Sequence, residues 1–147
     1  MRILVSACLL GVNCRYDAKR IPINEAVARL MEKHELIPFC PEAYGGLTTP
    51  REPSEIRDGR VWSRGGRDVT ENFQRGAEEA LALARLLRCD CALLKEKSPS
   101  CGAGKIYDGT FTGRLVEGDG FAAAALKGAG YRVCGESEID GLLRVER

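Results

Sequence analysis

Four short apolar runs alternate with helix-like segments along the chain, and this alternation is the feature that most restricts its fold. The runs cover residues 2–7, 35–40, 91–95 and 131–134. Strands that alternate with helices are typical of a parallel sheet with helices on both faces. The pattern predicts an α/β protein, a three-layer α/β/α sandwich with a mainly parallel, four-stranded, Rossmann-like sheet. A length of 147 residues suits a single domain over residues 1–147.

Three segments between the runs have helical patterns. Asn24 can cap the first helix, and Asp68 or Thr70 can cap the longest one. The third is an Ala-rich helix over residues 121–127. The residues expected at the periodic positions of the first two helices are Val27, Leu30, Met31, His34, Phe73, Ala77, Leu81, Ala84 and Leu87.

Two long connections are expected to be irregular. Residues 8–20 are polar, and residues 41–66 are rich in Gly and Pro. Asp58-Gly59 within the second connection predicts a small hairpin, and another turn is expected at residues 107–110. Loops of this length in a compact domain are usually functional or disordered.

Three cysteines lie where a predicted strand gives way to a turn. They are Cys8, Cys40 and Cys101. Right-handed crossovers place the loops after parallel strands on one edge of the sheet, which is the usual ligand crevice. We therefore expect these three thiols to lie together at that edge. Cys14 is a further candidate, either as a ligand or as a pocket residue.

The seven cysteines favour metal ligation over disulfides. Their number is odd and no export signal precedes the first run, so we expect a reducing cytoplasm, where disulfides are rare. Cys89, Cys91 and Cys134 are expected to pack as small apolar residues. None of the other four forms a close C-x2-C pair, and dispersed thiolates fit an iron–sulfur cluster as well as zinc.

Composition excludes several other functions. The 22 basic and 21 acidic residues nearly balance, so no long-range field favours nucleic acid or anionic lipid. Aromatic residues make up 6% and are not interleaved with basic ones, which disfavours a stacking platform for single strands. No apolar stretch is long enough to span a bilayer. One histidine is too few for a histidine-rich zinc site and makes a Ser-His-Asp triad hard to build.

Polar residues beside the three cysteines are candidates for chemistry. Glu42 follows Cys40 and Pro41, and is expected to be a general acid/base or, alternatively, a solvated loop carboxylate. Ser98 and Ser100 are suited to hydrogen-bond a polar substrate, although they could form only a tight turn. Arg51 could orient an anion or carbonyl, with surface exposure as the alternative. Tyr16 could stack on a flat ring.

Several motifs together resemble a known family. The motifs are VSACLLG at 5–11, CRYD at 14–17, PFCPE at 38–42, GGL at 45–47 and SPSCG at 98–102. They resemble the family long filed as domain of unknown function 523, some members of which are thiouracil desulfidases. The resemblance runs from Met1 to about Gly130 with the motifs in order, and it matches the short, single-domain form of the family.

The resemblance implies an oxygen-sensitive 4Fe-4S cluster held by three cysteines, with one iron open. By position, Cys8, Cys40 and Cys101 are the implied ligands. The implied reaction removes sulfur from a thiolated pyrimidine such as thiouracil and gives uracil and sulfide without electron transfer. Glu42 would act on a water molecule, and Ser100 with Ser98 would hold the edge of the ring.

The same residues are also compatible with other functions. A zinc-binding hydrolase, or a non-catalytic module that senses metal or redox state, could use the same cysteines. The substrate could be a free thiolated base, a nucleoside or a base from tRNA breakdown, whereas balanced charge disfavours intact nucleic acid. No pattern in the sequence indicates an oligomeric state.

Overall fold

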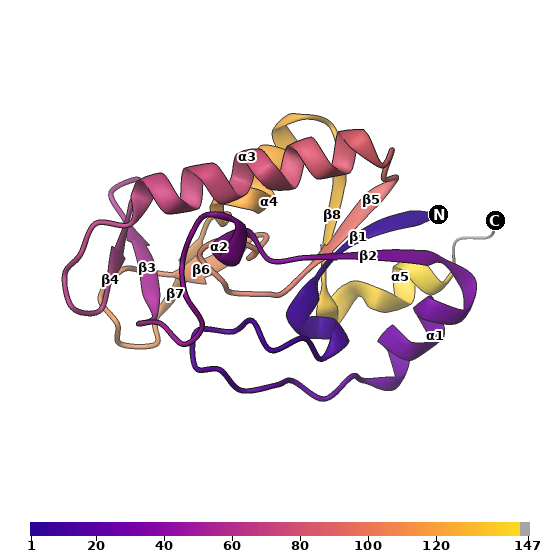
Figure 1. Cartoon of the computed structure of the whole chain (residues 1–147), viewed down its shortest axis with the longest axis horizontal. Helices are drawn as coiled ribbons and strands as arrows, with labels where there is room; N and C mark the ends of the chain where they lie inside the picture. The colour runs from indigo at the N-terminus through magenta and orange to yellow at the C-terminus, as the bar shows by residue number, and fades with distance from the viewer. Residues whose placement is uncertain (145–147) are drawn as a thin grey trace.

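The central sheet of the protein contains four parallel strands (Figure 1). The computed structural model describes residues 1–144. The strands are β1 (Arg2–Ser6), β2 (Glu35–Phe39), β5 (Cys91–Leu94) and β8 (Arg132–Gly135). Their order is β2-β1-β5-β8, and every neighbouring pair is parallel. The predicted α/β fold with a four-stranded parallel sheet is therefore confirmed.

Helices cover both faces of the sheet and make the outer layers (Figure 1). On one face lie α1 (Glu25–Lys33) and α5 (Ile139–Leu143), and on the other α3 (Thr70–Leu86) and α4 (Phe121–Gly128). Side chains of β1 alternate between the two faces: Ile3 and Val5 pack toward α1, and Leu4 packs toward α3. Both faces are apolar because both are buried.

Helix α1 begins as its sequence predicts. Asn24 Oδ1 accepts the backbone N–H of Val27 at 2.8 Å, which satisfies one of the free donors of the first turn. Leu30 is buried as expected, but Met31 is 52% exposed, so it lies outside the buried face. His34 ends the helix and is buried, with Nδ1 3.0 Å from the terminal amine.

Helix α3 also follows its predicted pattern. It begins at Thr70, whose backbone N–H and hydroxyl both donate to Asp68 Oδ1, at 3.0 and 2.6 Å. Phe73, Ala77 and Ala84 are buried as expected. Leu81 and Leu87 pack partly buried against the same core.

Two hairpins extend beyond the sheet. Strands β3 (Ser54–Arg57) and β4 (Arg60–Ser63) are joined through the predicted Asp58-Gly59 turn. Strands β6 (Lys105–Tyr107) and β7 (Leu115–Glu117) form the second hairpin, and β3 contacts β6. The sequence predicted only a turn in this second region, because three-residue strands carry no readable alternation.

Several short helices were not predicted. These are η1 (Ala7–Leu10), α2 (Pro41–Tyr44), η2 (Glu136–Glu138) and α5. Helix η1 begins where the first strand was expected to end, and α2 lies inside the predicted loop of residues 41–66. Elements of three to five residues are too short to show a helical period, so tertiary packing decides them.

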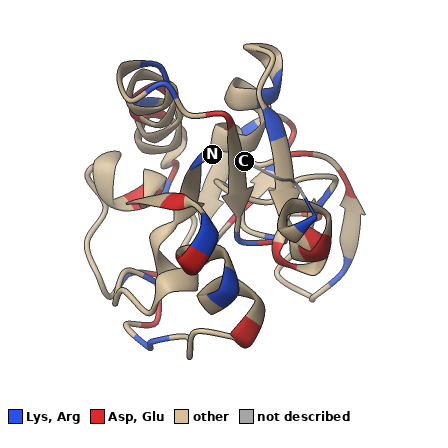
Figure 2. Ribbon diagram, turned by 90° about the vertical axis from the view of Figure 1, so that its right-hand side faces the viewer, with Lys and Arg blue, Asp and Glu red and all other residues tan. Residues whose placement is uncertain are grey.

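Charged residues are mixed over the surface. Figure 2 shows basic and acidic segments interspersed along the ribbon. No helix within residues 1–144 has the length and apolarity that a membrane crossing requires.

Candidate functional site

A cavity of about 470 Å³ lies at the carboxyl ends of the central strands. Ser6 at the end of β1, Phe39 at the end of β2 and Lys95 just after β5 line it. Residues from the two hairpins, among them Glu55 and Tyr107, line it as well. The cavity is thus at the edge where parallel sheets usually bind ligands.

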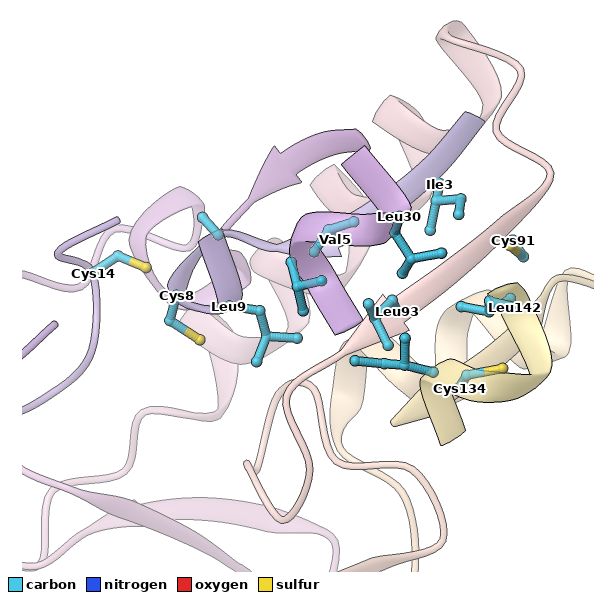
Figure 3. Close-up of a cluster of buried hydrophobic side chains, with 13 residues drawn as sticks. Ile3, Val5, Cys8, Leu9, Cys14, Leu30, Cys91, Leu93, Cys134 and Leu142 are labelled. Carbon is cyan, nitrogen blue, oxygen red and sulfur yellow. The ribbon is translucent and has the colours of Figure 1, made fainter. Parts of the chain in front are cut away.

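Four cysteines line this cavity. Cys8 lies in η1, Cys14 in the loop that follows, Cys40 directly after β2, and Cys101 in the loop after β5. Figure 3 shows Cys8 and Cys14 at the same end of the buried cluster of side chains. The fold therefore brings three separate parts of the chain to one space.

The arrangement of these thiols matters for the kind of group that they can hold. Within residues 1–144 there is no group of three or more His, Cys, Asp and Glu side chains that could hold a metal ion. A four-iron cluster makes a different demand, because its thiolates bind irons at separate corners. Cys8, Cys40 and Cys101 line a shared cavity, and thiolates are the ordinary ligands of such clusters.

Two of the thiols are held in their protonated form at neutral pH. Burial raises the pKa of Cys101 to about 12, although hydrogen bonds from Ser6 and Ser100 oppose the rise. A hydrogen bond with the Cys14 thiol, together with burial, raises the pKa of Cys40 far above its usual range. Because metals bind thiolates, loading this site must release protons.

Cys14 lies close to two of the candidate ligands. Its thiol interacts with the thiols of Cys40 and Cys8. The hydrogen bond with Cys40 lowers the pKa of the Cys14 thiol. The hydrogen bond with Cys8 and burial of the thiol have the opposite effect and are together larger, so the pKa is raised. Cys40 Sγ also lies 3.8 Å from the Cys14 carbonyl oxygen.

Glu42 is directed into the site by α2 and is held from two sides. Its Oε1 accepts from Arg51 Nε at 3.0 Å, and its Oε2 accepts from the Ser100 hydroxyl at 2.8 Å. The side chain is only 15% exposed. The carboxylate is therefore fixed in the cavity rather than solvated on a loop.

The hydroxyls of Ser98 and Ser100 have a defined direction. Ser98 Oγ accepts the backbone N–H groups of Ser100 and Cys101, each at 3.1 Å. With both lone pairs used, its proton can only be donated to Ser100 Oγ, 2.9 Å away. Ser100 in turn donates to Glu42, so a chain of hydrogen bonds runs from Ser98 through Ser100 to the carboxylate.

Arg51 uses most of its donors within the protein. Besides the bond to Glu42, Nη2 donates to the Cys14 carbonyl at 2.9 Å. Nη1 donates to the Thr48 carbonyl and to Thr49 Oγ1, at 2.9 and 3.1 Å. A guanidinium has five N–H groups, so one is not used in these four hydrogen bonds.

Tyr16 also lines the cavity, at its outer part. Tyr16 is 40% exposed. The Arg15 guanidinium lies 5.8 Å from its ring centroid. The structure therefore places an aromatic residue beside the cavity, with Arg15 over its ring.

Three glycines allow the segments around the site to pack closely against one another, and the sequence did not predict this packing. A Cβ at Gly76 of α3 would lie 2.7 Å from the Pro41 carbonyl carbon, and one at Gly120 would lie 2.6 Å from that of Ser100. Gly45, at the end of α2, approaches Asn72 of α3 in the same way. Only Gly76 carried a signal, because glycine inside a long helix is unfavourable without a packing reason.

The remaining cysteines are apart from the cavity. Cys89, Cys91 and Cys134 are buried in the core, as predicted. Figure 3 shows Cys91 and Cys134 near Leu142, at the other end of the cluster from Cys8. All seven cysteines are free.

Comparison with known proteins gives consistent matches along nearly the whole chain. The family described as 2-thiouracil desulfurase matches residues 3–138. The uncharacterized protein YbbK of Bacillus subtilis (strain 168) is 42% identical, over 96% of this chain and 99% of its own. The solved structure of a 4Fe-4S-dependent thiouracil desulfidase, TudS, is 43% identical with a TM-score of 0.90, covering 96% of this chain and 94% of its own.

The motifs that carried the resemblance all lie within the matched range, and their cysteines and Glu42 meet in one cavity. The chain belongs to the 2-thiouracil desulfurase family, whose members the sequence motifs had indicated.

Proposed function

We propose that this protein is a 4Fe-4S-dependent desulfidase that removes the exocyclic sulfur of a thiolated pyrimidine such as thiouracil. Membership of the 2-thiouracil desulfurase family and the likeness to TudS support this proposal. The observation that carries it for this chain is that Cys8, Cys40, Cys101 and Glu42 line the same cavity.

The proposed cluster ligands are Cys8, Cys40 and Cys101, with Cys14 as a further candidate. A cluster bound by three thiolates leaves one iron open, and when bound it supplies a Lewis-acidic acceptor for sulfur. The donor set is suitable because thiolates are the ordinary ligands of such clusters.

The reaction is a hydrolysis without change of oxidation state. The thiocarbonyl C–S bond is replaced by a C–O bond from water, and the products are the carbonyl base and hydrogen sulfide. Both protons of the water leave with the sulfide, so no electron donor or acceptor is needed.

Glu42 and Ser100 are the proposed catalytic residues. Glu42 takes a proton from the attacking water, and the Arg51 and Ser100 hydrogen bonds hold its carboxylate in position for that task. Ser100 keeps its proton directed at Glu42 because Ser98 donates to it from the other side. Tyr16 and the remaining N–H of Arg51 are the proposed contacts for the base. Ser98, whose oxygen and proton are both used within the hydrogen-bond chain, is proposed to act on the base through Ser100.

The proposed substrate is a small molecule. The protein is proposed to be a single domain over residues 1–147 and to act in the cytoplasm. The cavity volume of about 470 Å³ lies in the usual range for small-molecule sites. Seven free thiols suit a reducing compartment. The near-balanced charge gives no support to intact nucleic acid as the substrate.

The direct experiment is anaerobic reconstitution with iron and sulfide, removal of the excess reagents, and incubation with 2-thiouracil. We expect stoichiometric uracil and sulfide, with no dependence on an added reductant. A brown, loaded protein that releases neither product from thiolated bases would contradict the proposed function.

The role of Glu42 is tested separately. We expect Glu42→Gln to lower kcat by about 10²–10⁴-fold, the usual contribution of general acid–base catalysis, with the visible absorption of the cluster unchanged. Glu71→Gln, an exposed site in the first turn of α3, is the matched control. Full turnover by a loaded Glu42→Gln protein would show that this role is wrong.

A further inference from the structure

Phe111 has an unusual backbone at the edge of the cavity. Its φ is 59°, in the left-handed region that residues with a bulky side chain seldom adopt. It lies between β6 and β7, outside the central sheet, yet it lines the cavity. Backbone conformations of this kind persist where surrounding contacts enforce them, and they gather at functional sites.

Glu55 of the neighbouring hairpin enforces this conformation. Its Oε1 accepts the backbone N–H groups of both Gly109 and Phe111, each at 3.0 Å. The loop lies directly on β3, since a Cβ at Gly109 would be 2.7 Å from Arg57 Cβ. One carboxylate on β3 thus fixes the loop that bears Phe111.

The ring of Phe111 is in turn placed by Arg64, at the end of the same β3–β4 hairpin. The Arg64 guanidinium lies 5.6 Å from the ring centroid, so it covers one face. Phe111 and Arg64 both line the cavity. Aromatic side chains offer flat heterocycles a large contact at low conformational cost.

Phe111, Glu55 and Arg64 are not among the residues proposed to carry out the reaction. Within residues 1–144, no hydrogen bond joins Glu55 or Phe111 to Glu42, to Ser100 or to a cavity cysteine. An effect on binding without an effect on the chemical step is therefore the expected signature of this part of the cavity.

We propose that Phe111 is a specificity-determining residue, the wall against which the flat ring of the substrate packs, and that Glu55 is its positioning residue. The proposal rests on the proposed function in that it takes a thiolated pyrimidine as the ligand. The two hairpins then select for a planar ring, while the thiols and Glu42 act on its sulfur.

The first test compares variants of Phe111 in the loaded enzyme with 2-thiouracil. We expect Phe111→Ala to raise KM by about tenfold, as for the loss of one base–aromatic stack, and to leave kcat within about twofold. Phe111→Tyr, which keeps the ring, should restore the KM of the wild type. An unchanged KM in Phe111→Ala, or a rise of that size found only in Tyr16→Ala, would overturn the assignment.

The second test follows the loop itself by hydrogen exchange, which does not depend on turnover. We expect Glu55→Ala to speed exchange of the Gly109 and Phe111 amides and to raise KM in parallel, while Glu55→Gln, which keeps an acceptor, has a smaller effect. Glu52→Ala is the matched control, because Glu52 accepts the Gly65 N–H but does not line the cavity. Faster exchange in Glu55→Ala with an unchanged KM would refute the link to substrate.

The two proposals fail in different ways. Absence of sulfide release by the wild-type enzyme contradicts the proposed function. Normal release by the wild type together with an unaltered KM in Phe111→Ala contradicts only the role of this wall.

Discussion

Glu42 is oriented by residues from two distant parts of the chain. Arg51 binds one of its oxygens and Ser100 the other, and Arg51 also binds the carbonyl of Cys14. The carboxylate therefore has little rotational freedom before a substrate arrives. Groups held in this way need little reorganisation during the reaction, which is the general basis of preorganised catalysis.

At the residue scale, iron content should separate the ligands from the other cysteines. We expect Cys8→Ser, Cys40→Ser and Cys101→Ser each to lose most of the bound iron, because a cluster with two thiolate ligands is poorly held. Cys89→Ser is the control, since it removes a buried thiol that lies outside the cavity. The measurement is iron per chain after anaerobic reconstitution.

The same measurement assigns Cys14. We expect Cys14→Ser to retain about four irons and the visible absorption of the wild type, because three other thiolates are enough for a cluster with an open iron. Loss of the cluster in Cys14→Ser would make Cys14 a ligand and would contradict this expectation.

The sequence predicted that the proposed site residues lie together, but it did not predict their contacts. Every residue singled out for the site, from Cys8 to Cys101, lines the cavity, because turn residues after buried strands mark the ligand edge of a parallel sheet. The hydrogen bonds of Arg51 could not be foreseen. They depend on how residues 41–66 fold back, and no local pattern encodes that path. Glu55 and Phe111 were missed for the same reason.

At the element scale, the placement of α2 depends on glycine in α3. We expect Gly76→Ala to destabilise the protein by about 1–3 kcal/mol, as overpacking usually does, because the new methyl group meets the backbone of Pro41. Iron binding should fall as well, since Pro41 lies between Cys40 and Glu42.

Gly128→Ala is the matched control for this substitution. Gly128 also lies in a helix, but a Cβ there meets nothing within 4 Å. The same change should be neutral or should stabilise by up to about 1 kcal/mol, the helix propensity gained. Equal effects of the two substitutions in urea unfolding would contradict the close approach of α3 to α2.

The start of α3 should make stability depend on pH. Hydrogen bonds from the Thr70 hydroxyl and N–H, with the Arg60 guanidinium, lower the pKa of Asp68 to about 2. The folded pKa lies below the unfolded value of 3.8, so this stabilisation is present above that value and is lost as pH falls toward about 2.

We therefore expect Asp68→Asn to lower the Tm at neutral pH, with a difference from the wild type that narrows below about pH 4. Glu79→Gln on the exposed side of α3 is the control and should show no such trend. A constant difference in Tm across the acidic range would contradict the assignment.

The longer elements were predictable and the shorter ones were not. The apolar period of α3 and the buried run of β1 are strong local signals, and both were confirmed. Helix α2 has only four residues, and its one signal is a proline suited to a first turn. Its helical form is decided by packing on α3, which a local pattern does not show.

At the scale of the whole molecule, most core residues lie outside the cavity of the proposed cluster. Two apolar cores, one on each face of the sheet, consist mainly of aliphatic and aromatic side chains, although Cys8, Cys14 and Cys101 belong to them as well. We expect the cluster-free protein to be folded, and cluster loading to raise its Tm by roughly 5–15 °C, since a ligand that binds only the native state stabilises it.

Calorimetry of the protein before and after anaerobic loading measures this shift. Cys101→Ser treated in the same way is the control, because it should not load and its Tm should not rise. A cluster-free protein without a cooperative transition would show that the cluster is needed for folding.

The position of the cavity cysteines in the sequence also has a consequence for when the proposed cluster site forms during folding. Cys8 is made early, but its partner Cys101 reaches it only when β5 has joined β1 and the loop of Ser100 rests on Gly120. A chain that is still being synthesised therefore lacks a complete set of the proposed ligands. The proposed cluster would therefore be loaded only into a nearly complete chain, and the cluster-free protein would be a folded form that can be loaded later.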